Sequence, residues 1–181
     1  SILLHCINDF ERISDHAVNI RDSAVEMHKK KISITRDGRE ELAVYSKAVH
    51  DIVQETIQAF RTGNLEMARQ VEPFEEVIDG LSIDMKQRHI TRLRKGMCTM
   101  EAGLMLEDII TNYERVSDHC SNVAVCMLQI NEDGFDTHEY LELAAEEDSS
   151  WFREQCAGLS KKYELPEKRK KLPDEAEAGS L

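Results

Sequence analysis

The chain has 181 residues and a formal net charge of −12, with only three Pro and eight Gly to interrupt helices. Hydrophobic residues make up 41% and aromatic residues only 6% of it, a balance that favours an all-α protein filled with aliphatic side chains. The acidic charge argues against nucleic acid as a partner, and no apolar run is long enough to insert into a bilayer.

Apolar residues spaced three or four apart predict a first helix over residues 1–31. The basic run at 29–31 suits the negative end of that helix dipole. A second helix is predicted to begin with Asp37 and Glu40 as a capping box and to stop at Gly63, which favours a helix C-terminus.

Three more helices are predicted along the rest of the chain. Asn64 is a good N-cap for the third, which closes at Gly96, and the fourth covers about 99–130. Short connections between these helices imply antiparallel neighbours, so we expect an elongated antiparallel helical bundle.

The fifth helix is expected over 136–163, with Trp151 and Phe152 as its anchors in the core. The charged, Pro-bearing composition of 164–181 predicts a disordered tail.

One charged phrase occurs twice, 103 residues apart, as DFERISDH (9–16) and NYERVSDH (112–119). Seven of fourteen positions around it are identical, and they are Ile7/Ile110, Glu11/Glu114, Arg12/Arg115, Ser14/Ser117, Asp15/Asp118, His16/His119 and Asn19/Asn122. The chain therefore contains an internal repeat.

The acids of the phrase, Glu11 with Asp15 and Glu114 with Asp118, are four residues apart and share one helix face. Apolar residues lie on the same face. If that face is packed, the carboxylates must be paired, protonated or bound to a cation.

Glu75 and Asp79 on the third helix have the same spacing. Antiparallel packing of the third and fourth helices would bring them close to Glu114 and Asp118. A metal site with oxygen ligands would relieve the repulsion of four carboxylates. Basic side chains would relieve it too, and three are available: Arg12, Arg115 and Lys86.

ERISDHAVNI and ERVSDHCSNV closely resemble the signature of the PhoU family, typically ERxxDxxxNI. The matching residues are Glu11, Arg12, Asp15, Asn19 and Ile20 in the first copy and Glu114, Arg115, Asp118, Asn122 and Val123 in the second. The segment VEPFEEVIDGL is similar to the acidic segment of the family's second helix, with Glu75 and Asp79 at its acidic positions.

The resemblance implies tandem three-helix bundles that carry iron or zinc on those carboxylates. It also implies regulation of phosphate transport and homeostasis, and no enzymatic activity. LLHCINDFERISDH and RHITRLRKGMCT look most like the cytosolic C-terminal PhoU domain of bacterial Na⁺/phosphate cotransporters. We therefore expect a regulatory domain at the cytoplasmic face of the membrane, within a longer transporter chain. Its partners would be the membrane part of the transporter or its regulators.

On this resemblance, 1–31 is the last helix of an incomplete first repeat and 35–131 is a complete second repeat. The metal site expected on the complete repeat comprises Glu75, Asp79, Glu114 and Asp118, whereas Glu11 and Asp15 lack a partner helix. The first helix should also expose an apolar seam, which the fifth helix or a second copy of the chain would cover, as in a homodimer.

Two alternatives remain at this point. A ferritin-like di-iron carboxylate oxidase needs Glu-x-x-His pairs, and the sequence contains none. A metal-free helical interaction module, in which the acids pair only with Arg and Lys, is compatible with the pattern. Five cysteines without a CxxC pair indicate free thiols in a reducing compartment.

Overall fold

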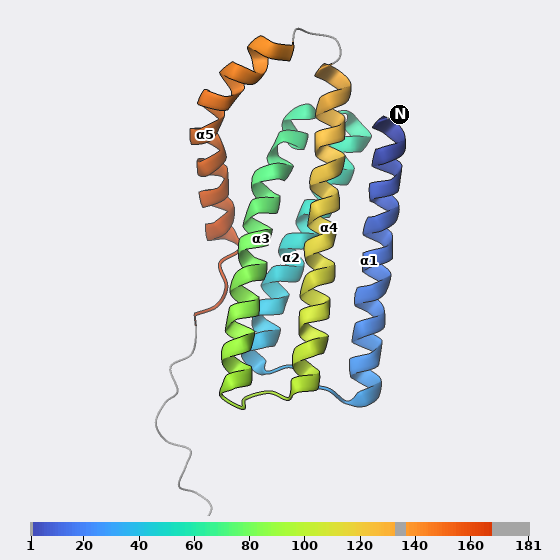
Figure 1. Ribbon diagram of the computed structural model, residues 1–181, viewed down its shortest axis with the longest axis vertical. Coiled ribbons are helices and arrows are strands. Elements are labelled where there is room, and N and C mark those ends of the chain that lie inside the picture. Colours follow the sequence, from blue (N-terminus) through green and yellow to red (C-terminus); the bar gives the residue numbers. More distant parts are fainter. Residues whose placement is uncertain (1, 133–136, 168–181) are drawn as a thin grey trace, which may run out of the picture.

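The computed structural model describes residues 2–132 and 137–167, with side chains described over 3–130 and 150–167. These residues form five helices: α1 (Ile2–Lys30), α2 (Arg36–Thr62), α3 (Leu65–Arg94), α4 (Met100–Glu132) and α5 (Thr137–Lys162). Helices α1 to α4 stand side by side in an elongated antiparallel bundle, and α5 lies on the outer side of α3 (Figure 1). The predicted all-α bundle is confirmed. Each of the four long helices measures about 40–50 Å at 1.5 Å per residue.

The start of α2 differs from the expected capping box. Thr35 is the N-cap, and its hydroxyl accepts a hydrogen bond from the backbone N–H of Gly38 at 3.2 Å. Glu40 instead pairs with Arg36 on the helix surface. The helix begins one residue earlier than Asp37 because a Thr hydroxyl already satisfies a free N–H of the first turn.

The turn between α2 and α3 follows the prediction. Gly63 ends α2 in the left-handed conformation, with φ of 64°, and its N–H bonds to the carbonyl of Ala59. Asn64 caps α3 by accepting a hydrogen bond from the N–H of Met67 at 3.1 Å. One Gly and one Asn therefore reverse the chain between two long helices.

Replacing Gly63 by Ala is expected to lower the free energy of unfolding by about 1 kcal/mol, because a Cβ disfavours positive φ. No atom lies within 4 Å of the added Cβ, so the cost comes from the backbone alone. Gly80, inside α3 and equally unobstructed, is the control: Gly80→Ala should stabilise by about 1 kcal/mol. Urea unfolding measures the change in unfolding free energy for both variants. If both substitutions stabilise the protein, or both destabilise it, the left-handed conformation assigned to Gly63 is contradicted.

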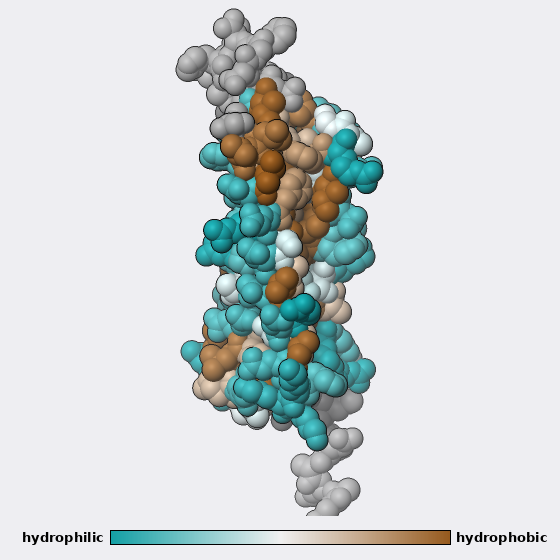
Figure 2. All heavy atoms as spheres, turned by 90° about the vertical axis from the view of Figure 1, so that its right-hand side faces the viewer, coloured by the Kyte–Doolittle hydropathy of each residue, from teal (hydrophilic) through white to brown (hydrophobic). Residues whose placement is uncertain are grey.

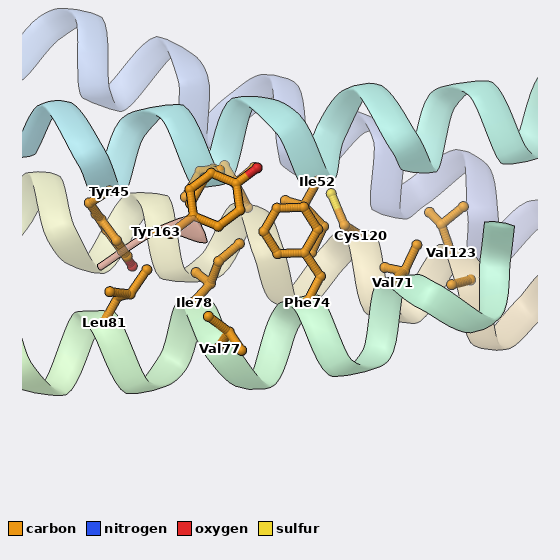
Figure 3. Close-up of a cluster of buried hydrophobic side chains, with 14 of the residues drawn as sticks. Tyr45, Ile52, Val71, Phe74, Val77, Ile78, Leu81, Cys120, Val123 and Tyr163 are labelled. Carbon is orange, nitrogen blue, oxygen red and sulfur yellow. The ribbon is translucent and has the colours of Figure 1, made fainter. Parts of the chain in front are cut away.

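The hydrophobic core lies where α2, α3 and α4 face one another. Tyr45 and Ile52 of α2, Phe74 and Ile78 of α3, and Val123 of α4 are all at most 2% exposed. Figure 3 shows these side chains meeting between the helices. Helices α2, α3 and α4 thus share one hydrophobic core.

Helix α5 is held to the bundle by its C-terminal end. Tyr163, just past the helix, stacks on Phe74 with ring centroids 5.2 Å apart and donates a hydrogen bond to Asp51 at 2.6 Å. Leu165 is also buried, so packing continues into the stretch where a tail was expected. Trp151 and Phe152, the expected anchors, are only half-buried. Most of the expected tail, 168–181, lies outside the described residues.

Helices α1 and α4 pack antiparallel through the two copies of the repeated phrase. His16 Nδ1 lies 2.9 Å from Asn112 Oδ1, and His119 Nδ1 lies 2.8 Å from Asp9 Oδ1. The side-chain amides of Asn19 and Asn122 donate to the same two acceptors, Asn112 and Asp9 respectively. The two imidazoles stack with centroids 5.6 Å apart. Because Asp9 and Asn112 are equivalent positions of the repeat, these contacts are related by an approximate twofold axis.

The outer face of α1 remains open. Leu3, Leu4, Ile7 and Val18 are 45–58% exposed, and Figure 2 shows apolar side chains gathered along this side of the molecule. Helix α5 does not cover them, because it packs on α3. The expectation that the fifth helix closes this seam is therefore wrong, whereas a second copy stays a prediction.

Candidate metal centre

Three carboxylates from two helices converge between α3 and α4. Glu75 and Asp79 lie one turn apart on α3, and Asp118 lies on α4. One carboxylate oxygen from each lies within 4.8 Å of the other two, and all three side chains are half-buried. The antiparallel packing of α3 against α4 thus brings three of the four predicted residues into one group.

The local sequence explains why the acids sit at the edge of the core. Phe74 and Ile78 are buried and fix the rotation of α3. Their direct neighbours Glu75 and Asp79 are turned about 100° along the helix, which places them at the margin of the packed seam. The acids are therefore partly shielded from water but are not enclosed.

Glu114 is the fourth predicted residue, and it is engaged differently. Its Oε2 accepts hydrogen bonds from Ser82 Oγ at 2.7 Å and from Lys86 Nζ at 2.6 Å. Burial opposes its ionisation, but the bonds from Lys86 and Ser82 outweigh burial and lower the pKa of Glu114. Lys86 therefore neutralises Glu114, as one of the two sequence hypotheses allowed.

The two predicted acids on α3, Glu75 and Asp79, are harder to ionise than free carboxyl groups. Burial, followed by the charge of Asp79, raises the pKa of Glu75 from 4.5 to about 7. Burial, followed by the charge of Asp118, raises the pKa of Asp79. Arg115 contacts Asp118 from the exposed side at 3.2 Å, yet the group still carries more negative than positive charge. A bound cation or a proton would relieve it.

The donor set fits a divalent metal ion. Asp79 Oδ1 is fully buried and has no hydrogen-bond partner among the described residues, and an unpaired buried oxygen is costly. All three candidate ligands are carboxylate oxygens, which suit hard or borderline cations such as Mg²⁺, Mn²⁺, iron and Zn²⁺. The ligands would be Glu75, Asp79 and Asp118, and Glu114 lies beside them, held by Lys86.

Glu11 and Asp15 do not form such a group. Both are exposed on α1, and no cluster of three acid, His or Cys ligands among the described side chains includes either one. Among the described helices, α1 packs chiefly on α4. Glu11 and Asp15 therefore lack a third ligand among the described side chains, and a metal site that includes them stays a prediction.

Some contacts around the site were not predicted from the sequence. Ser82 was missed as a donor to Glu114, although its position seven residues, or two helical turns, after Glu75 places it on the same face. Glu72 was also missed: it accepts a hydrogen bond from Ser121 of α4 at 2.8 Å. The only signal in the sequence was their spacing from Glu75: Ser82 lies seven residues after it and Glu72 lies three residues before it.

Two comparisons with known proteins found matches. The model of the family described as PhoU domain matches residues 26–127. The chain is 28% identical over 139 residues to the phosphate-specific transport system accessory protein PhoU homolog 1 of Thermotoga maritima. That alignment covers 77% of this chain and 59% of the relative's length, and no solved structure matches significantly.

The matched region runs from the end of α1 through α2 and α3 and along most of α4. It therefore contains the three-helix core, the second copy of the repeated phrase and the carboxylate group. Since the match covers more than half of the chain, the chain belongs to the PhoU domain family.

Proposed function

We propose that this chain is a regulatory domain of a phosphate uptake system and that it holds a divalent metal ion on Glu75, Asp79 and Asp118. The observation that carries the metal assignment is the convergence of these carboxylates within 4.8 Å, together with the unpaired, buried Oδ1 of Asp79. Iron and zinc are the leading candidates for the ion, since the resemblance to the PhoU family implies them.

The phosphate part of the proposal is supported by family membership and by the name of the Thermotoga relative. The wording around the two motifs favours a Na⁺/phosphate cotransporter as the system regulated. The partner would then be the membrane part of that transporter, at its cytoplasmic face. Among the described residues, no helix combines the length and the apolar character needed to cross a membrane.

A metal-free interaction module is the second candidate, and the Lys86–Glu114 ion pair favours it. That pair shows that part of the acidic charge is already compensated by protein. Three carboxylates nevertheless remain close together after this compensation, so we place the metal-binding domain first.

Metal content of the purified chain tests the assignment. The protein, prepared without a metal-affinity column and incubated with Fe(II) or Zn(II), should retain near-stoichiometric metal after gel filtration. The variant Asp79→Asn/Asp118→Asn should retain almost none, because it loses two of the three charged ligands. Elemental analysis by mass spectrometry measures both.

The matched control is Glu11→Gln/Asp15→Asn, which alters the equivalent acids of the first repeat on the exposed face of α1. It should retain metal like the parent. A parent that stays free of metal would refute the metal site and leave the interaction module. Phosphate uptake by cells lacking the gene, with and without the parent restored, tests the regulatory part separately, and unchanged uptake would refute that part.

A further inference from the structure

The outer face of α1 carries a regular row of exposed side chains, at the edge of the bundle (Figure 1). Alternate spacings of three and four residues define this row, which we call the α1 seam: Leu4, Ile7, Glu11, Ser14, Val18, Arg21, Val25 and His28. Its four apolar side chains are 43–58% exposed. Such alternate spacing is the heptad pattern with which one helix packs along another. The α1 seam therefore suits contact with a further helix.

The internal repeat shows how the equivalent face of α4 is used. With the offset of 103 residues, Leu106 and Ile110 of α4 correspond to Leu3 and Ile7 of α1. Leu106 and Ile110 are at most 1% exposed, and both belong to the hydrophobic core. Leu3 and Ile7 are each 52% exposed. The same apolar face is thus covered on α4 and open to water on α1, where covering it would be favourable.

Two charged residues of the α1 seam select the helix that fits it. A parallel copy of α1 would place Glu11 against Glu11 and Arg21 against Arg21, and like charges repel. An antiparallel copy in full overlap places Glu11 against the partner's Arg21, and twofold symmetry forms this pair twice. Arg21 contacts its neighbour Asp22 at 2.7 Å, but both side chains are more than 60% exposed, so that contact is weak and leaves Arg21 able to meet a second acid.

The apolar positions of the α1 seam agree with the same register. It places Ile7 opposite the partner's Val25, and Ser14 opposite the partner's Val18. A shift by one heptad in either direction would instead place Arg21 against an apolar side chain of the partner, where a charge without a counter-charge is costly. The charged and the apolar positions therefore favour one antiparallel arrangement.

We propose that two copies of this chain bind each other through the α1 seam, with the two α1 helices antiparallel and Glu11 of each copy paired with the partner's Arg21. The contact is isologous, because the same surface serves on both sides. The carboxylates of the candidate metal centre lie between α3 and α4 and are not part of the α1 seam. Dimerisation and metal binding can therefore be tested separately.

Sedimentation equilibrium of the full chain tests this contact. The parent should form a dimer. Glu11→Arg and Arg21→Glu should each weaken the dimer at least about tenfold, because each change replaces two attractive contacts with two repulsive ones. An equimolar mixture of these two single variants should regain the parental affinity, since each contact between the two different chains then joins opposite charges.

Arg12→Glu is the matched control, because it changes the net charge of the chain by the same amount as Arg21→Glu. Arg12 is also exposed on α1, but it is turned about 100° from Glu11 and lies off the α1 seam. This variant should dimerise like the parent, and circular dichroism should show the same helix content in all variants. A parent that stays monomeric at every concentration would overturn the proposal. So would a single variant at Glu11 or Arg21 that dimerises like the parent, or a mixture that stays monomeric.

Discussion

Changing Glu41 to Gln is expected to lower the free energy of unfolding by about 3–5 kcal/mol, the cost of breaking a buried ion pair. Glu41 of α2 is 3% exposed, and its two oxygens contact Arg92 Nη1 at 3.0 and 2.8 Å. Arg88 adds a contact at 3.3 Å. The amide of Gln keeps the shape but removes the charge, so both guanidinium groups lose their anionic partner in a poorly solvated place.

Glu26→Gln is the matched control, because it also removes one carboxylate from an ion pair. The pair with Lys30 is half-exposed on the surface of α1, so its loss should cost about 0.5 kcal/mol or less. Urea unfolding with a common slope gives both values. If the two substitutions lower the unfolding free energy by the same amount, then solvent screens the ion pairs of Glu41 with Arg88 and Arg92. Those ion pairs would then not hold α2 to α3.

Cation affinity is expected to fall about 50-fold between pH 7 and pH 5, approaching about tenfold per pH unit at the acidic end of this range. The cause is Glu75, whose pKa is raised to about 7 by burial and then by Asp79: below that pH it must lose a proton before it can bind metal. Above about pH 7 the affinity should level off. Isothermal titration with Mn²⁺ across this pH range measures the effect.

The same group sets the stability of the protein when no cation is added. Between the usual Glu value of 4.5 and about 7, the folded state binds more protons than the unfolded state. Unfolding free energy should therefore fall as the pH rises through this window. Glu75→Gln should remove both effects, whereas Glu11→Gln, on the exposed face of α1, should leave them intact. A parent with affinity independent of pH would contradict the raised pKa.

Much of the fold followed from periodicity and helix ends. Apolar spacing and helix-end signals together located all five helices, and Gly63 and Asn64 marked the α2–α3 turn because few residues suit those backbone positions. The start of α2 was misplaced because Thr35 and Asp37 both suit an N-cap. Only the hydrogen bond from the Gly38 N–H to the Thr35 hydroxyl, seen in the folded turn, distinguishes them. The residue that anchors α5 was missed because Trp151 and Phe152 were chosen for their size. Tyr163 is the anchor because it stacks on Phe74 and donates a hydrogen bond to Asp51.

The candidate site was predictable to the extent that helical spacing determines it. The i, i+4 spacing placed Glu75 with Asp79 and Glu114 with Asp118, and antiparallel packing then brought three of these four carboxylates together. Spacing could not show that Lys86 pairs with Glu114, because that pairing depends on the axial register of α3 against α4. The buried cluster at Glu41 was also missed, because its members come from two helices without any repeated pattern.

The approximate twofold axis between α1 and α4 has a consequence for how the two copies diverge. In an assembly of two identical chains, any substitution on the axis appears on both sides at once. Here both copies belong to one polypeptide, and one copy has Asp9 where the other has Asn112, yet each presents an oxygen to one imidazole and one amide. The two copies share the position of that acceptor oxygen, so each half of the repeat can carry a different charge there.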